Sequence, residues 1–196
     1  MKNTQLDQSI TNQNIVVFSG SLKKASWNQK LVQIAGEMAA SLGANVTEIS
    51  LRDYPLPLFN EEIEHEDHAG LSDLRAVFSR ADGMIIASPE YNGSITPALK
   101  NAIDWISRPS SEQNYTPNYA QQKAAIIATS PGGLGGLRGL THLREILSNL
   151  GTHVIPAQLA VPTAYEAFNE SGDLSNAATK DRLQAIVEQF LKLSLN

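Results

Sequence analysis

Short runs of consecutive apolar residues alternate along this chain with segments in which apolar residues recur every three or four positions. The runs lie at residues 15–18, 46–51 (interrupted by polar residues), 84–87, 124–128 and 154–155. Helical spacing follows them at residues 31–42, 71–78, 97–106, 140–150 and 183–191. Continuous runs are typical of strands buried on both faces, and spacings of three and four are typical of amphipathic helices. The pattern predicts five strand–helix units, the fifth strand being short.

Five such units predict an α/β fold, a three-layer sandwich whose parallel sheet has helices on both faces. Right-handed crossovers favour the doubly wound strand order 2-1-3-4-5 of flavodoxin-like folds. Thr96 before Pro97 predicts the start of the third helix, and Pro109 and Gly151 predict the ends of the third and fourth. No linker divides the chain. We therefore expect one flavodoxin-like domain over residues 14–196, after a polar, disordered tail at residues 1–13.

Composition narrows the function classes. The chain has 196 residues and a net charge of −5, and its densest basic cluster is Lys23-Lys24, which argues against nucleic-acid binding. The longest apolar runs are strand-sized, so no membrane span is expected. Residues 1–13 lack an apolar segment, so we expect no secretory signal and a cytoplasmic protein.

The chain contains no cysteine, which excludes disulfides, thiolate nucleophiles, cysteine zinc sites and iron–sulfur clusters. The segment from His65 to His68 has residue types that can bind a metal. It lies in a polar, acidic stretch without periodicity, for which a solvated loop is the simpler interpretation. We predict no metal site.

The loop after the first strand, residues 20–28, indicates a phosphate site. A helix that begins there presents unpaired N–H groups and a partial positive charge, and Ser21, Ser26 and Asn28 can add hydrogen bonds to an anion. An ordinary capping box of Ser26 and Gln29 is the alternative, although it leaves Ser21 and Asn28 unexplained. The loop has neither the G-x-x-x-x-G-K-[ST] nor the G-x-G-x-x-G motif.

Two further loops should meet the first at the carboxyl edge of the sheet. They are residues 88–93 and residues 129–139, and the latter hold five of the thirteen glycines. Glycine lets bare backbone approach a flat ligand, and Tyr91 can pack on a ring, although it could also merely cover the sheet end. Together the loops predict an elongated ligand with a phosphate at one end and a planar ring at the other.

Residues 20–28, 89–92 and 99–105 closely resemble the NAD(P)H-dependent FMN reductase family, which includes FMN, quinone, azo-dye and chromate reductases. The resemblance extends from Asn14 to about Leu193. It implies an FMN site formed at the phosphate by Ser21, Lys23, Ser26, Trp27 and Asn28, along the ring by Pro89, Glu90, Tyr91 and Asn92, and on its other side by Ser130 and Gly132. The family usually has arginine at position 23, and lysine loses the planar bidentate fork.

The resemblance implies hydride transfer from NADPH or NADH to FMN, followed by electron transfer to a small-molecule acceptor. The cofactor would carry this chemistry, so no catalytic side chain or metal is expected. It also implies a homodimer or homotetramer. The acceptor, the preference between NADPH and NADH, and the role of Arg138 stay open. The loop of residues 54–60 is expected either to border the pocket and influence the acceptor or simply to cover the sheet.

Two other functions fit the same fold. A flavodoxin-type electron carrier would bind FMN but need a protein redox partner, and such carriers are typically more acidic, with a first loop richer in threonine. A regulatory module with a degenerate flavin site is disfavoured, because all three loops look intact. NADPH oxidation without a partner protein separates the enzyme from the carrier.

Overall fold

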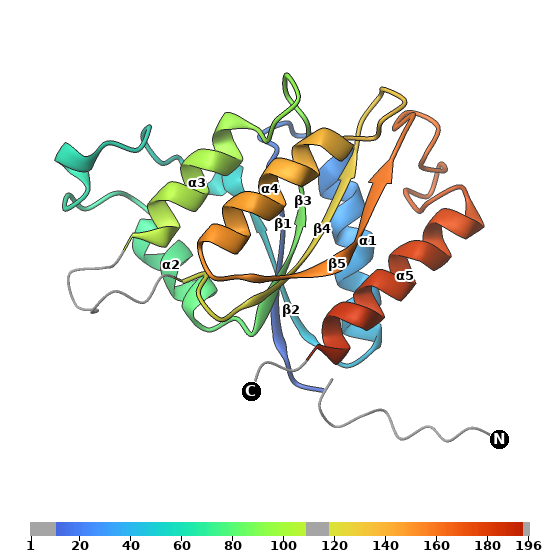
Figure 1. Ribbon diagram of the computed structural model, residues 1–196, viewed down its shortest axis with the longest axis horizontal. Helices are drawn as coiled ribbons and strands as arrows, with labels where there is room; N and C mark the ends of the chain where they lie inside the picture. The colour runs from blue at the N-terminus through green and yellow to red at the C-terminus, as the bar shows by residue number, and fades with distance from the viewer. Residues whose placement is uncertain (1–10, 109–117, 194–196) are drawn as a thin grey trace.

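Five parallel strands form one sheet with helices on both faces (Figure 1). The computed structural model describes residues 11–108 and 118–193. Its strands are β1 Asn14–Ser19, β2 Asn45–Ser50, β3 Gly83–Ala87, β4 Lys123–Thr129 and β5 His153–Val161. Its helices are α1 Trp27–Ser41, α2 Leu71–Ser79, α3 Pro97–Ser107, α4 Leu137–Asn149 and α5 Ala177–Lys192, with 3-10 turns η1 Leu51–Asp53 and η2 Glu61–Ile63. The order β2-β1-β3-β4-β5 confirms the predicted flavodoxin-like topology.

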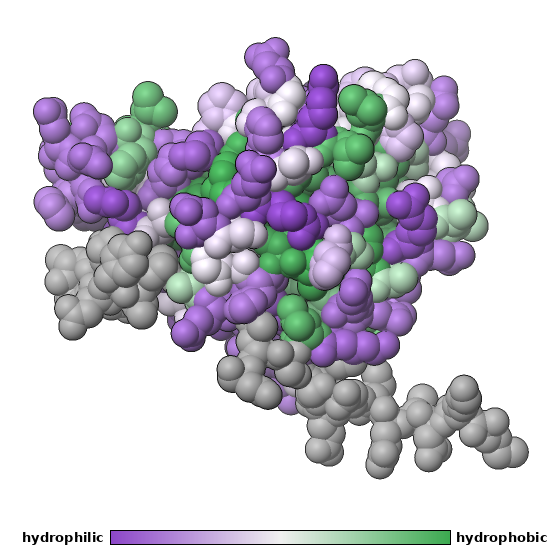
Figure 2. Space-filling view, in the orientation of Figure 1, coloured by the Kyte–Doolittle hydropathy of each residue, from purple (hydrophilic) through white to green (hydrophobic). Residues whose placement is uncertain are grey.

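Alternate residues of the central strands face two separate hydrophobic cores. In β1, Ile15 and Val17 pack with α1 and α5, whereas Val16 and Phe18 pack on the other face with α2, α3 and α4. Burial on both faces explains why these strands are continuously apolar in sequence. Figure 2 shows the resulting surface, where polar side chains cover most of the visible face and apolar ones reach it in smaller areas.

The fifth strand is longer than predicted. It runs from His153 to Val161, and its register with β4 shifts between Ala124 and Ile126. Pro156 interrupts the apolar pattern, but β5 is an edge strand, where proline and a bulge are tolerated. The guanidinium of Arg144 donates to the carbonyls of Val154, Ile155 and Pro156 and thereby satisfies backbone groups at the bulge.

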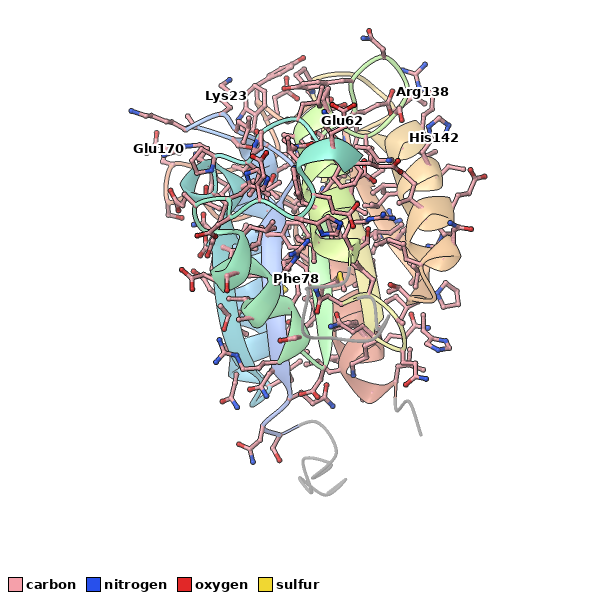
Figure 3. The ribbon with its side chains drawn as sticks, turned by 90° about the vertical axis from the view of Figure 1, so that its left-hand side faces the viewer. Lys23, Glu62, Phe78, Arg138, His142 and Glu170 are labelled. Carbon is pink, nitrogen blue, oxygen red and sulfur yellow. The ribbon has the colours of Figure 1, made fainter. Side chains whose placement is uncertain are left out.

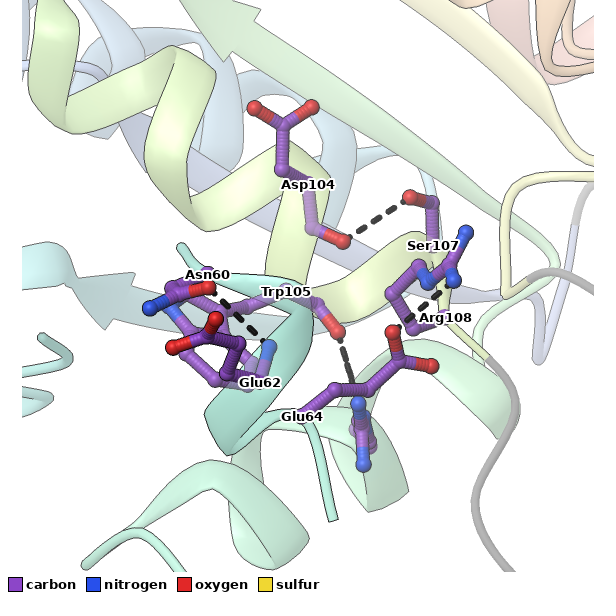
Figure 4. A network of polar contacts seen from close by, with 8 residues as sticks. Asn60, Glu62, Glu64, Asp104, Trp105, Ser107 and Arg108 are labelled. Atoms are coloured by element: carbon purple, nitrogen blue, oxygen red, sulfur yellow. Dashed lines mark hydrogen bonds and ion pairs between the residues drawn. The ribbon is translucent and has the colours of Figure 1, made fainter. Parts of the chain in front are cut away.

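The loop between β2 and α2 is anchored on α3. Trp105 donates its indole N–H to the Pro57 carbonyl at 2.7 Å, and Asn101 binds the backbone of Pro57 and Phe59. Farther along, Arg108 pairs with Glu64 at 2.8 Å (Figure 4). The Arg108 hydrogen bond and charge outweigh the effect of burial and hold the pKa of the Glu64 carboxyl below its usual range. Trp105 is buried and therefore anchors this loop to the core.

Two sequence predictions fall partly outside the described residues. Residues 1–10 of the expected tail and Pro109 are outside them, and α3 ends at Ser107. At the described end of the tail, Asn12 donates its backbone N–H to Gly43 and Gln13 donates its side-chain amide to Leu191. None of the described helices has the length and apolar content needed to cross a membrane.

Lys123 is a buried cation at the amino end of β4. Its residue is 3% exposed, and its ammonium donates to Gln13 Oε1 at 2.8 Å and to the carbonyls of Leu191 and Leu193. The ammonium also lies 5.0 Å from the ring centre of Phe190. Burial lowers the pKa of Lys123 to about 8, although Asp82 opposes this shift.

We expect this lysine to make stability depend on alkaline pH. An unfolded lysine keeps its proton to about pH 10.4, so between pH 8 and that value only the unfolded state binds the proton. The contribution of Lys123 should therefore rise with pH, by about 2 to 3 kcal/mol across this window. Urea unfolding of the unaltered protein and of Lys123→Met between pH 7 and 10.5 measures it. Parallel pH curves for the two proteins would contradict the expectation.

Candidate functional site

Three loops meet where β1, β3 and β4 end, as the sequence predicted. Ser19 of β1 is in register with Ala87 of β3, which is in register with Ile127 of β4. The Gly20 N–H donates to the Ala87 carbonyl, and the Ser88 N–H donates to the Ile127 carbonyl. Figure 3 shows Lys23 and Arg138, from the first and third loops, at this same end of the molecule.

The first loop turns tightly through its serines. Ser19 Oγ accepts the Ser21 N–H, and Ser21 Oγ in turn accepts the Lys23 N–H, both at 3.2 Å. Thr96 donates its hydroxyl to the Gly20 carbonyl at 2.5 Å and so fixes the beginning of the loop against α3. Ser21 is largely buried, and no acceptor among the described residues takes its hydroxyl hydrogen.

Ser26 is the N-cap of α1, as the alternative interpretation of this loop required. Its Oγ accepts the Gln29 N–H at 3.3 Å. The Gln29 side chain does not complete a capping box, because it donates instead to Glu48 Oε1 at 2.7 Å. The first turn of α1 contains no acidic residue, so its N–H groups and partial positive charge are not neutralised from within the helix.

Asn28 links two of the loops through its side-chain amide. Its Nδ2 donates to the Thr129 carbonyl at 2.8 Å, and its Oδ1 accepts the Thr129 N–H at 3.0 Å. The residue is 5% exposed. Because both ends of its amide bind the last residue of β4, Asn28 joins the start of α1 to the third loop.

Lys23 and Trp27 lie next to each other at the mouth of the first loop. The Lys23 ammonium lies 5.2 Å from the ring centre of Trp27, a cation–π contact. Lys23 is exposed and Trp27 is partly exposed. Their positions place one exposed cation beside the beginning of α1.

The second loop contains a two-residue hairpin. Tyr91 and Ser94 exchange both backbone hydrogen bonds, and Asn92 and Gly93 between them have φ of 53° and 82°. Two consecutive positive φ values are the geometry for which Asn-Gly is preferred. Tyr91 stands at the base of this hairpin with 54% of its surface exposed, and Pro89 precedes it with its carbonyl accepting the Ser88 hydroxyl.

The glycines of the third loop serve two purposes. A Cβ on Gly135 would lie 2.7 Å from the Val161 carbonyl carbon, and one on Gly136 would lie 2.7 Å from the Ala128 Cβ. Both residues also have positive φ. A Cβ on Gly133 would meet no described atom within 4 Å, and one on Gly132 would meet only Ser130 Oγ at 3.9 Å. The fold itself therefore requires glycine at positions 135 and 136, and the close approach of a ligand to this loop stays a prediction.

Ser130 begins the third loop and is fixed by its backbone. Its N–H donates to the Val161 carbonyl at 3.2 Å, and its own carbonyl accepts the Ala164 N–H at 3.0 Å. These bonds tie the loop to β5 and to the segment after it.

Glu90 joins the second and third loops. Its carboxylate accepts the Arg138 Nε–H at 2.7 Å and the backbone N–H groups of Arg138 and Gly139 at 3.0 and 3.3 Å. Its side chain is 8% exposed, against 64% for that of Arg138. Burial raises the pKa of the Glu90 carboxyl, but the hydrogen bonds from Arg138 and Gly139 outweigh it and hold the pKa below its ordinary value. Arg138, whose role the sequence left open, forms an ion pair within the chain.

A cavity of about 400 Å³ lies between the first loop and the segment after β2. Its walls are apolar side chains that include Leu22, Leu56 and Leu74, and Lys24 and Arg52 are its charged members. The expected loop of residues 54–60 contributes Tyr54, Pro55 and Leu56.

A doubly wound sheet in which a helix start suited to an anion follows the first strand is typical of flavodoxin-like nucleotide-binding proteins. The family of NADPH-dependent FMN reductases matches residues 13–166, and the chain belongs to this family. It is 36% identical over 183 residues to an NAD(P)H:quinone oxidoreductase of Solanum tuberosum, with 90% of each chain covered. It is 31% identical over 181 residues to an NAD(P)H-dependent FMN reductase of Pseudomonas aeruginosa, with 91% of each covered.

Among solved structures, the chain is similar to FerB, a flavoenzyme NAD(P)H:(acceptor) oxidoreductase from Paracoccus denitrificans. The TM-score is 0.78 at 27% identity, covering 91% of this chain and 95% of FerB. These findings confirm the predicted class, a flavin oxidoreductase that uses FMN and a nicotinamide cofactor.

Proposed function

We propose that this chain binds FMN across the three loops, takes electrons from NADPH or NADH, and passes them to a small-molecule acceptor such as a quinone. The start of α1 carries the proposal. It combines a helix N-terminus without an acidic residue in its first turn with the hydroxyls of Ser21 and Ser26. Those hydroxyls accept hydrogen bonds from the backbone and keep their own hydrogens to donate to a phosphate.

The difference between the N-termini of α1 and α4 also fits FMN. The N-terminus of α4 also lies at this edge, but the Glu90 carboxylate already accepts its first N–H groups. An anion is therefore directed to α1, and the region between the second and third loops is left for an uncharged ring. There Tyr91 offers a stacking surface, and Asn92 and the loosely surrounded backbone of Gly132 offer polar groups.

The residues of the three loops divide between the phosphate and the ring of FMN. Ser21, Ser26 and the first N–H groups of α1 bind the phosphate, with Lys23 as a mobile countercharge next to Trp27. Pro89, Tyr91 and Asn92 bound one side of the ring, and Ser130 and Gly132 the other. Asn28 and Glu90 hold the loops rather than contact the cofactor. When bound, FMN supplies the redox chemistry, accepting hydride from the nicotinamide and releasing electrons to the acceptor.

We further propose that the acceptor reaches the flavin from the side of the cavity beside the first loop, where Tyr54 and Leu56 limit its shape. Free FMN, quinones, azo compounds and chromate are the acceptors to compare.

We also propose that residues 14–196 act as one domain, in the cytoplasm, as a homodimer or homotetramer. The absence of cysteine supports the compartment, and the exposed Tyr91, Leu134 and Leu137 support an additional subunit contact.

A direct assay tests the function. The purified protein with added FMN should show a flavin absorbance spectrum after removal of free flavin, and should oxidise NADPH or NADH steadily with a quinone and no protein partner. Oxidation that requires a partner protein would favour the electron carrier. Failure to retain flavin would favour the regulatory module. A panel of acceptors at fixed NADPH and at fixed NADH then ranks the substrates.

A further inference from the structure

We propose that Glu90 is a positioning residue that sets the separation of the two ring-binding loops through Arg138 and the start of α4. The inference rests on the proposed function, because it assigns the ring of FMN to the space between these loops. It gives Glu90 a role distinct from the flavin-lining one implied by resemblance.

The contacts of Glu90 indicate that its carboxylate binds α4 and not a ligand. Both oxygens accept hydrogen bonds from α4, one from the guanidinium of Arg138 and the other from the N–H groups of Arg138 and Gly139. The side chain is almost completely buried. Charge-assisted bonds of this kind are about twice as strong as neutral ones, so the carboxylate is held firmly where it is.

The close packing of Gly139 strengthens the connection. A Cβ there would lie 3.2 Å from the Ser94 carbonyl oxygen and 3.4 Å from the Glu90 Cβ. The second loop therefore lies directly against the first turn of α4. A second link joins the same elements, since Ser94 Oγ and His142 Nδ1 are 2.9 Å apart.

The helix α4 needs this external cap. Its N-cap is Gly136 in the left-handed conformation, with no side-chain cap bond, and its first turn has no acidic residue. Glu90 supplies from another loop what an N-cap side chain would supply locally. Loss of its charge should release both the start of α4 and the hairpin at Tyr91, and with them both sides of the ring site.

The test compares binding of FMN and of riboflavin, which lacks the phosphate. Glu90→Gln should weaken binding of both flavins by the same factor, about tenfold, because the change acts on the ring side of the site. Arg138→Met should have a smaller effect, since the two backbone hydrogen bonds to Glu90 remain. Asp173→Asn is the control, because the Asp173 carboxylate also binds a cationic side chain, that of Lys180, and a backbone N–H, but it is more exposed and lies in the loop before α5. It should leave both affinities unchanged.

Amide hydrogen exchange of the flavin-free protein provides a readout independent of the cofactor. Glu90→Gln should speed exchange in residues 91–96 and 132–139 together, and Asp173→Asn should not. Flavin affinities within twofold of the unaltered protein, a loss confined to FMN, or exchange unchanged in these segments would overturn the proposal. If the unaltered protein binds neither flavin, the proposed function fails, and the exchange result still decides whether Glu90 joins the two loops.

Discussion

Replacing Ser21 with alanine and Ser26 with glycine should lower the affinity for FMN by about a hundredfold while leaving the affinity for riboflavin unchanged. Each change removes one hydroxyl placed to donate to the phosphate, and a hydrogen bond to a charged group contributes about 1.5 kcal/mol or more. Two such losses correspond to about a hundredfold in the dissociation constant. Glycine is chosen at position 26 because it caps helices nearly as well as serine, so α1 keeps its start.

Flavin fluorescence titration measures both dissociation constants. Ser41→Ala is the control, since Ser41 lies at the other end of α1 and its hydroxyl donates to the Met38 carbonyl. An equal loss for riboflavin and FMN would place the two hydroxyls at the ring instead of the phosphate. Unchanged FMN affinity would remove the phosphate site from this loop.

The fold could be predicted from the sequence because a parallel strand that is buried on both faces appears in the sequence as a continuous apolar run. That signal identified β1, β3 and β4 and, through the strand order, the three loops that share an edge. The same signal underestimated the length of β5, where Pro156 breaks the apolar run and the side chain of Arg144 donates hydrogen bonds to backbone carbonyls. An edge strand bulge of this kind has no periodic pattern to detect.

The candidate site was predictable in outline but not in its internal bonds. Asn28 and Thr129 are 101 positions apart, and Glu90 and Arg138 are 48 apart. Bonds over such separations produce no local motif, so the sequence indicates neither of these pairs. The packing requirement at Gly135 and Gly136 is hidden in the sequence for a similar reason, because the atoms of β4 and β5 approach these residues only after the chain folds.

Asn28→Ala should lower the free energy of unfolding by about 4 kcal/mol, because it leaves both the N–H and the carbonyl of Thr129 without the partner they have in the buried site. FMN affinity should fall as well, for the start of α1 and the third loop would lose their connection. Asn28→Asp keeps the acceptor for the Thr129 N–H but sets a carboxylate against the carbonyl, so it should be no less destabilising than alanine.

Asn101→Ala is the matched control for this change. Asn101 also lies on a helix and uses both ends of its amide on a distant backbone, at Phe59 and Pro57, but it is more exposed. Water can replace its bonds, so its loss should cost about 1 kcal/mol. Urea unfolding of the flavin-free variants compares the two. Equal costs at the two positions would show that the Asn28–Thr129 pair contributes no more than a surface loop anchor, and the first and third loops would then be held together by packing alone.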